Sequence, residues 1–242
     1  MIFVLLSNLL LMKKHIPNFI TCLNLFSGCI GIVYAFKGDL IIAGYAILLA
    51  ALFDFIDGLI ARLLTVYSEI GKQLDSLADM VSFGVLPSVI IYQLFLESPQ
   101  VGTVSPYLNF SAFLIAIFSA LRLAKFNIDV RQSENFIGLP TPANAVLIAS
   151  LPMILAQGNW FLSAYILNPF FLFIFSLGMS ILLVTEIPLI SLKFKSLKLS
   201  DNLFRYILVI SAILLVIIFK FAAVPLIVFI YILLSLIQFR LR

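Results

Sequence analysis

Acidic side chains are the residues of this sequence with the clearest capacity for chemistry. The chain contains 11 of them, and four aspartates fall within 26 positions: Asp54, Asp57, Asp75 and Asp79. Their spacings of i,i+3 and i,i+4 place each pair on one face of a helix. The flanking sequence is strongly apolar, where carboxylates without partners are costly and repel one another. A bound divalent cation offsets that cost, because carboxylate oxygens are hard ligands suited to Mg²⁺, Mn²⁺ or Ca²⁺.

Small residues accompany these acids. Gly58 and Ala61 follow Asp54 by one and two helical turns on nearly the same face, which leaves room for a ligand against the helix backbone. Mg²⁺ usually binds few carboxylates together with substrate phosphate, so the pattern predicts a phosphorylated substrate. Two alternatives are helix-end acids paired with Arg62 and Lys72, and a cation pathway. The crowding of the acids at one end of two helices favours the phosphorylated substrate.

The elements that hold these residues are predicted from composition. Of the 242 residues, 63% are hydrophobic and 11% charged, and the mean hydropathy is +1.20. A soluble domain is nearer to about half apolar and about a quarter charged. The excess apolar surface cannot all be buried in one core of this size and must face lipid. The sequence therefore predicts an all-α integral membrane protein and excludes a disordered chain, a disulfide scaffold and a soluble enzyme.

A membrane-spanning helix needs about 20 apolar residues, and the apolar runs predict eight of them in one transmembrane catalytic domain, residues 16–242. Residues 1–15 form an N-terminal segment, in which Met12 resembles a more ordinary start than Met1. The fifth run is short, and an alternative is that one of the last two is interfacial. The predicted spans are 16–36, 41–62, 74–97, 107–126, 143–157, 169–190, 205–219 and 222–239.

Basic residues predict the orientation of these helices. With a cytoplasmic N-terminus and eight alternating helices, 13 of the 15 basic residues fall on one side, and Lys37 and Lys220 fall on the other. Such a bias marks the cytoplasmic side, so we expect cytoplasmic termini and a cytoplasm-facing site in the inner membrane of a prokaryote. The net charge of +4 does not indicate nucleic-acid binding, because no basic stripe with interleaved aromatics occurs. The cytoplasmic set is Lys13, Lys14, Arg62, Lys72, Arg122, Lys125, Arg131, Lys193, Lys195, Lys198, Arg205, Arg240 and Arg242.

The full acidic motif resembles a known signature. Asp54-x2-Asp57-Gly58-x2-Ala61-Arg62-x8-Gly71-x3-Asp75-x3-Asp79 is similar at every position to that of the CDP-alcohol phosphatidyltransferase family. Members of that family are membrane enzymes that displace CMP from a CDP-linked alcohol with a second alcohol. Further stretches, at 16–24, 120–127, 136–143 and 185–193, resemble the serine-specific branch. The resemblance thus covers nearly the whole chain and is strongest over 16–145.

The resemblance implies roles for individual residues. It implies that Asp54, Asp57, Asp75 and Asp79 surround a Mg²⁺ or Mn²⁺ ion, and that Asp79 is also the general base for the attacking hydroxyl. It implies transfer of the phosphatidyl group from CDP-diacylglycerol to L-serine, with glycerol 3-phosphate or inositol as alternative acceptors, in a homodimer. A cation transporter or a non-catalytic membrane scaffold is the alternative from another class. The residues implied to contact the CDP moiety are Thr21, Asn24, Gly58, Ala61, Arg62 and Gly71.

Basic residues after the fourth predicted helix are candidates for acceptor or phosphate binding. Arg122, Lys125 and Arg131 lie there, and arginine can bind a carboxylate with two parallel hydrogen bonds. The orientation rule alone also accounts for basic residues in a cytoplasmic loop. The segment from Gly138 to Pro142 predicts a rigid turn before the fifth helix, because two prolines so close together fix the backbone.

Overall fold

The computed structural model describes residues 2–66, 68–100, 107–129, 136–190 and 199–240, and it describes side chains from residue 15 onward outside 130–137 and 199–201. It is helical throughout, apart from one short pair of strands, so the all-α prediction is confirmed. The first elements are α1 (Ile2–Phe36), α2 (Leu40–Leu63), α3 (Glu69–Asp79), the π-helix η1 (Met80–Val85), α4 (Leu86–Leu96), the 3₁₀-helix η2 (Leu108–Phe113) and α5 (Leu114–Ile128). The later elements are β1 (Phe136–Ile137), α6 (Thr141–Leu155), α7 (Trp160–Ile166), α8 (Pro169–Val184), β2 (Pro188–Leu189), α9 (Leu199–Phe219), η4 (Lys220–Ala222) and α10 (Ala223–Arg240).

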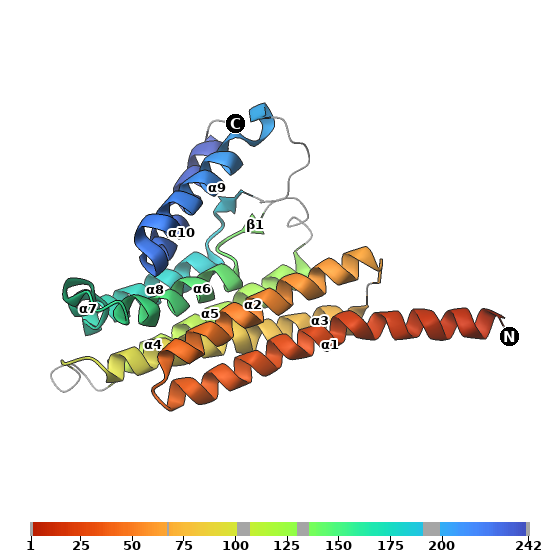
Figure 1. Cartoon of the computed structure of the whole chain (residues 1–242), viewed down its shortest axis with the longest axis horizontal. Helices are drawn as coiled ribbons and strands as arrows, with labels where there is room; N and C mark the ends of the chain where they lie inside the picture. The colour runs from red at the N-terminus through yellow and green to blue at the C-terminus, as the bar shows by residue number, and fades with distance from the viewer. Residues whose placement is uncertain (1, 67, 101–106, 130–135, 191–198, 241–242) are drawn as a thin grey trace.

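The core lies where α1, α2 and the continuous run α3–η1–α4 pack together and against α5, α6 and α8 (Figure 1). Its largest fully buried side chains include Phe83, Ile90, Ile115 and Ile148. Glycines let α1 approach its neighbours closely: a Cβ at Gly28 would collide with Ser82 of η1. Such small-residue contacts are typical of helices packed within a membrane.

The described residues contain five helices long and apolar enough to span a membrane, or up to six if the bent pair α7 and α8, which meet at 65°, forms one span. The first four are His15–Phe36, Leu40–Leu63, Glu69–Leu96 and Leu108–Ile128, close to the predicted bounds. The fifth, Asn202–Arg240, contains both α9 and α10. Eight spans are reached only if the 15-residue α6 also crosses and α9 and α10 cross separately, so that number stays a prediction.

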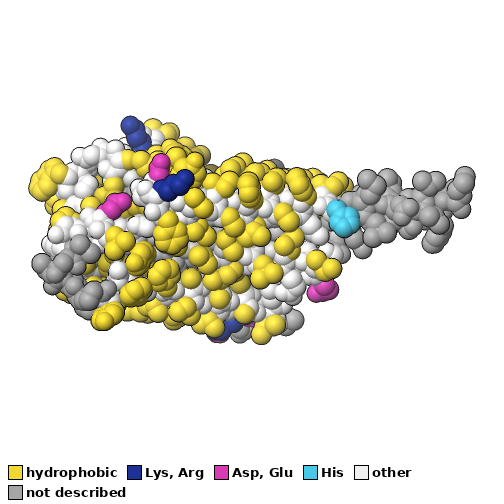
Figure 2. All heavy atoms as spheres, turned by 90° about the horizontal axis from the view of Figure 1, so that it is seen from below, with side chains coloured by type: hydrophobic (Ala, Val, Ile, Leu, Met, Phe, Trp, Pro, Cys, Tyr) yellow, Lys and Arg dark blue, Asp and Glu magenta, His cyan; other side chains and the backbone are white. Residues whose placement is uncertain are grey.

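Apolar side chains cover much of the outer surface. Figure 2 shows one face on which they form a broad, nearly continuous layer. On α1 and α2, the side chains of Phe19, Phe26 and Phe55 are each more than half exposed. A soluble protein rarely exposes so large an apolar area, and lipid is the solvent that accepts it. The protein is therefore a multi-pass membrane protein.

A short antiparallel strand pair joins two loops at one end of the bundle. Phe136 pairs with Leu189 and Ile137 with Pro188. The sequence did not predict strands here. Gly138 follows with a φ of +75°, and a Cβ there would lie 2.7 Å from the carbonyl oxygen of Leu183. Only glycine accepts both conditions easily. The chain therefore turns at Gly138, shortly before α6 begins at Thr141, as the sequence predicts.

The C-terminal helices α9 and α10 pack against each other, inclined to the layer of α1 to α5 (Figure 1). Most of their surface is exposed. On α10, the hydroxyl of Tyr231 donates to the carbonyl oxygen of Ile190 at 3.0 Å, and Ser235 Oγ accepts from the Ile190 amide at 3.1 Å. Because Ile190 directly follows β2, α10 holds the strand pair in place.

Candidate active site

The aspartates of the motif lie on two helices joined by a short connection. Asp54 and Asp57 are on α2 and Asp75 and Asp79 on α3, and α1 packs against both helices. Helix α2 ends at Leu63, and Ser68 caps α3 by accepting a 2.9 Å hydrogen bond from the amide of Gly71. A serine cap satisfies a backbone amide that the first turn of a helix leaves free. The sharp return brings the two acidic faces together.

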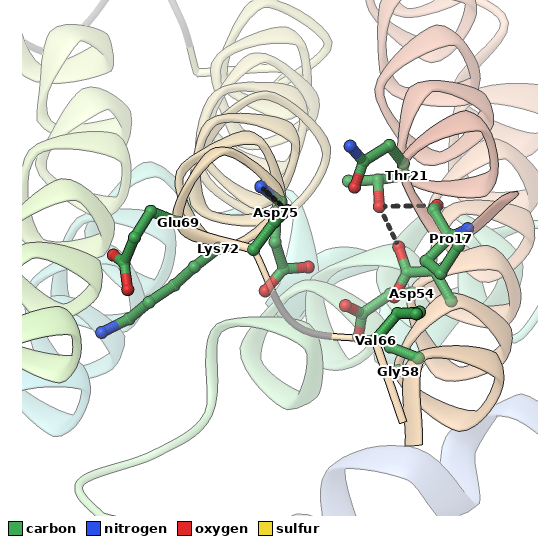
Figure 3. A pocket seen from close by; sticks show the side chains of 13 residues that line it. Pro17, Thr21, Asp54, Gly58, Val66, Glu69, Lys72 and Asp75 are labelled. Atoms are coloured by element: carbon green, nitrogen blue, oxygen red, sulfur yellow. Dashed lines mark hydrogen bonds between the residues drawn. The ribbon is translucent and has the colours of Figure 1, made fainter. Parts of the chain in front are cut away.

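Three of the four carboxylates converge. One oxygen each from Asp54, Asp57 and Asp75 lies within 4.8 Å of the other two. Oxygens bound to one Mg²⁺ or Ca²⁺ ion lie about 2.0–2.6 Å from it, so opposite ligands are about 4–5 Å apart. The three side chains therefore fit a divalent cation. Figure 3 shows Asp75 on α3 and Asp54 on α2 facing the same space.

Asp79 lies beside this group, not within it. Its side chain is buried, and its Oδ1 accepts a 3.3 Å hydrogen bond from Nδ2 of Asn24. It follows Asp75 by one helical turn on the same face of α3. The π-helix η1 begins at the next residue, Met80. Such wide turns inside helices often occur at functional sites.

Helix α1 supplies hydrogen bonds to the acids. The Thr21 hydroxyl donates to Asp57 Oδ2 at 2.6 Å and also lies 3.1 Å from the carbonyl oxygen of Pro17. Together with Asn24, which bonds Asp79, it orients one carboxylate of each helix. Groups that hydrogen-bond a metal-binding side chain fix its direction. The two α1 residues therefore orient the acidic cluster.

A pocket of about 500 Å³ opens next to the three carboxylates (Figure 3). Among the predicted CDP-contacting residues, Thr21, Gly58, Ala61 and Gly71 line it. Asn24 does not, because it turns to Asp79. The complete lining is Pro17, Asn18, Thr21, Asp54, Asp57, Gly58, Ala61, Val66, Ser68, Glu69, Gly71, Lys72 and Asp75.

Sequence reasoning missed part of this wall. Ser68 and Glu69 lie between Arg62 and Gly71, and Lys72 lies between Gly71 and Asp75, at positions where the signature specifies no residue type. Asn18 could have been inferred from the sequence, since it lies three residues before Thr21 on the same face of the first helix. At Gly71 an added Cβ would lie 2.9 Å from Oδ1 of Asn18, so the glycine permits the close approach of α3 to α1.

Arg62 of the motif and its neighbour Lys72 make no ion pair with the four aspartates in the part of the chain that the structure describes. Nε of Arg62 donates to the carbonyl oxygen of Gly58 at 2.8 Å, and Arg62 is outside the pocket lining. Nζ of Lys72 donates to the carbonyl oxygen of Asn127 at 2.9 Å. This excludes the alternative in which the aspartates are helix-end acids neutralised by Arg62 and Lys72.

Two of the three candidate acceptor residues, Arg122 and Lys125, lie apart from the pocket lining. Arg122 is buried on α5, with Nη1 3.5 Å from Oγ1 of Thr141 and its guanidinium over the ring of Phe126. Lys125 is exposed in the last turn of α5. Arg131 lies outside the described residues. The structure therefore brings Arg122 to the interior and leaves Lys125 at the surface.

The sequence is similar to a group of known proteins. The family described as CDP-alcohol phosphatidyltransferase matches residues 14–185. A CDP-diacylglycerol–serine O-phosphatidyltransferase of Helicobacter pylori (strain ATCC 700392 / 26695) is 35% identical over 195 residues, 80% of this chain and 78% of the relative. A protein of the same name from Bacillus subtilis (strain 168) is 33% identical over 175 residues, 72% of this chain and 89% of the relative. An archaetidylserine synthase of Methanothermobacter thermautotrophicus is 38% identical over 139 residues, 56% of each chain. With a matching motif, a converging acidic cluster and relatives of this similarity, the chain belongs to the CDP-alcohol phosphatidyltransferase family.

Proposed function

We propose that this protein transfers the phosphatidyl group from CDP-diacylglycerol to the hydroxyl of L-serine, which gives phosphatidylserine and CMP. The relatives named for that reaction support the choice of serine. The observation that carries the reaction class is the convergence of the Asp54, Asp57 and Asp75 carboxylates beside a pocket of about 500 Å³. That volume is in the range of small-molecule sites.

Asp54, Asp57 and Asp75, with Asp79 beside them, are the residues that would hold a divalent cation, Mg²⁺ or Mn²⁺. Such an ion neutralises charge on the pyrophosphate and on the departing CMP. Gly58 and Ala61 leave the pocket wall open along the backbone of α2, and Gly71 lets α3 approach α1 closely beside it. We assign the nucleotide diphosphate to this wall, with Thr21 in its lining and Arg62 outside the lining, bonded to the backbone of Gly58.

Asp79 is our candidate for the general base. A serine hydroxyl is a weak nucleophile until a neighbouring group accepts its proton. In the proposed step the proton passes from the hydroxyl to the Asp79 carboxylate, the serine oxygen bonds to the phosphorus that carries diacylglycerol, and the bond from that phosphorus to the CMP oxygen breaks. The hydrogen bond from Asn24 holds Asp79 in place.

The charge distribution supports a cytoplasm-facing site in the inner membrane. The acids lie near Arg62 and Lys72, at the helix ends where basic residues concentrate, and Lys37 lies in the turn between α1 and α2. Basic residues mark the cytoplasmic side. Eight spans, cytoplasmic termini and a homodimer belong to the same proposal.

The purified protein, given CDP-diacylglycerol and labelled serine, inositol or glycerol 3-phosphate, tests this function. We expect label from serine alone in the lipid, no product after chelation of divalent cations, and its return with Mg²⁺ or Mn²⁺. The Asp79→Asn variant should lose turnover by about 10²-fold or more and still bind CDP-diacylglycerol. Incorporation of inositol or glycerol 3-phosphate in place of serine contradicts the acceptor, and no incorporation from any of the three contradicts the enzyme class.

A further inference from the structure

The short helix α7 presents an edge of aromatic side chains outside the core. Trp160 is 80% exposed, Tyr165 57% and Phe161 53%. Their rings lie against one another: the centroids of Trp160 and Phe161 are 6.1 Å apart, and those of Phe161 and Tyr165 are 4.9 Å apart. The other side of α7 packs inward, with Ile166 buried in the core and Leu162 packed against it. We call Trp160, Phe161 and Tyr165 the aromatic edge.

The aromatic edge lies at the end of the bundle away from the acidic cluster. Helix α7 joins the end of α6 to the start of α8 and contacts both helices. The opposite ends of α6 and α8 come together near Gly138, where an added Cβ would lie 2.7 Å from the carbonyl oxygen of Leu183. Figure 1 shows α7 at the end of the molecule where α4 also finishes, whereas the α2–α3 connection lies toward the other end. Because the acidic end faces the cytoplasm in the proposed orientation, α7 lies toward the outer side.

The segment that carries the aromatic edge holds no charge. From Leu139 to Thr185 the sequence contains no Asp, Glu, Lys, Arg or His. Exposed aromatic side chains that lie together in an uncharged segment are poorly suited to water. Tryptophan and tyrosine are enriched at the two surfaces of a membrane, because each joins an apolar ring to a polar group. The composition of α7 therefore fits the membrane–water boundary better than water or the lipid interior.

The lengths of the neighbouring helices leave room for α7 at this boundary. Helix α6 has 15 residues and α8 has 16, which gives lengths of about 22 Å and about 24 Å. The hydrocarbon core of a membrane is about 30 Å thick, and tilt shortens the reach of both helices further. A helix that lies flat across their ends adds its own diameter of about 10 Å. Helix α7 thus fills the layer that α6 and α8 are too short to reach.

The bend between α7 and α8 is stabilised by hydrogen bonds at the start of each helix. The two helices meet at 65°. Oδ1 of Asn159 accepts from two amides in the first turn of α7, at 3.1 and 3.3 Å, and Oδ1 of Asn168 does the same for α8, at 2.9 and 3.2 Å. Backbone amides without partners are costly away from water, so these caps let α8 begin within the membrane. With α8 crossing the bilayer, the bend brings α7 closer to the membrane plane than to its normal.

We propose that α7 is an interfacial helix whose aromatic edge binds the head-group and ester region of the lipids at the outer membrane surface, while α8 alone continues across the bilayer. The partner of the aromatic edge is thus a lipid surface. Its contact with α7 fixes the depth at which α6 and α8 lie in the membrane. The inference goes beyond the proposed reaction and does not depend on which acceptor that reaction uses.

Fluorescence of the unaltered protein tests the depth of α7, because Trp160 is the sole tryptophan of the sequence. The purified full chain is placed in phosphatidylcholine vesicles that contain lipids spin-labelled either near the ester group or near the end of the acyl chain. An interfacial helix buries its apolar face about 5–10 Å into the head-group boundary, so we expect the ester-proximal label to quench at least about twofold more strongly than the chain-end label. Stronger quenching by the chain-end label would overturn the proposal. Strong quenching by iodide in the water, without quenching by either lipid, would overturn it as well.

A relocated tryptophan distinguishes a flat α7 from one that forms a single bent span with α8. In a Trp160→Phe background, Tyr165→Trp moves the probe five residues along α7, about 7 Å along the helix axis, and Ile174→Trp is the matched control on the exposed face of α8. We expect Tyr165→Trp to keep the quenching profile of Trp160, and Ile174→Trp to be quenched more strongly by the chain-end label. A Tyr165→Trp profile that shifts toward the chain-end label means that α7 descends into the membrane and contradicts the proposal. Thermal unfolding in detergent checks that each variant is folded, and the measurement on Trp160 itself needs no substitution.

Discussion

Gly58 shows how the absence of a side chain can leave room for a ligand in the pocket. It lies within α2 in the pocket lining, and the nearest atom to an ideal Cβ there is Nη2 of Arg62 at 4.0 Å. Glycine in a helix interior costs about 0.5–1 kcal/mol relative to alanine. Among the residues that the structure describes, no close packing requires this glycine, and its place in the pocket lining leaves the space beside it open to a ligand.

The Gly58→Ala variant separates the effect of this glycine on helix stability from its effect on ligand binding. We expect its thermal unfolding temperature in detergent to be equal to or above that of the wild-type protein, because alanine favours the helix and meets no close neighbour. The KM for CDP-diacylglycerol should rise about tenfold, since a methyl group narrows a closely fitted site.

Gly178→Ala is the matched control for Gly58→Ala. Gly178 lies inside α8, and no atom of the described residues stands within 4 Å of a Cβ placed there. The control should gain similar stability and retain its KM. A Gly58→Ala protein with unchanged KM would show that the open space at Gly58 does not contact the nucleotide.

The contact between α1 and η1 determines where Asp79 lies. Ser82 of η1 donates to the carbonyl oxygen of Asn24 at 3.0 Å, and Asn24 in turn donates to Asp79. Gly28, one turn after Asn24, faces the same serine: its Cβ would lie 3.0 Å from Cα of Ser82. This close approach of two backbones thus supports the hydrogen bond that holds the candidate base.

We therefore expect Gly28→Ala to destabilise the protein by about 1–3 kcal/mol, because the added methyl group overpacks a backbone contact. Thermal unfolding in detergent measures the loss. Turnover should also fall, since α1 and η1 must separate and the Asn24–Asp79 bond must lengthen. A variant with wild-type stability and turnover would mean that this interface is looser than the structure indicates.

The main helices and most of the acidic site could be predicted from the sequence. Apolar runs of sufficient length predict helices, and fixed spacing places Asp54, Asp57 and Asp75 on facing sides of α2 and α3. The wide turn of η1 could not be predicted, because the residues from Met80 to Val85 carry no local pattern that distinguishes a π-helix from an α-helix. The β1–β2 pair has two residues in each strand, too few to show an alternating pattern.

Side-chain partners across helices were less predictable than the helices themselves. Asn24 was expected to face the nucleotide, and the structure directs it to Asp79. Arg122 was expected in a loop, and it is buried beside Thr141. Both outcomes depend on the rotation of one helix against another, which is set by packing and not by the spacing within one helix.

At the scale of the whole molecule, the C-terminal hairpin formed by α9 and α10 is connected to the first turn of α6 through a chain of contacts. Tyr231 and Ser235 of α10 hold Ile190, which continues β2. β2 pairs with β1, and β1 leads through Gly138 into the first turn of α6. The hairpin thus helps to fix the position of Thr141 and Asn144, although most of its surface is exposed.

The proposed eight spans can be tested by thiol labelling of intact cells that produce the protein. Cys22 and Cys29 are free and exposed on α1 and can first be replaced by alanine. Single cysteines then go to exposed positions at the turns: Lys37, Gln157 and Lys220, with Lys125 as the site on the opposite side. We expect a membrane-impermeant thiol reagent to label the first three in intact cells, and Lys125→Cys only after permeabilisation.

Each position tests a different step of the topology. Lys37→Cys reports the orientation of α1 and α2 and serves as the positive control. Gln157→Cys follows α6, so protection from the reagent would mean that this 15-residue helix does not cross the membrane. Lys220→Cys lies in the turn between α9 and α10, and its protection would mean that the hairpin does not form two spans. The active site remains on the Lys125 side in either case, because α1 to α5 position it; labelling of Lys125→Cys in intact cells would instead overturn the cytoplasm-facing site.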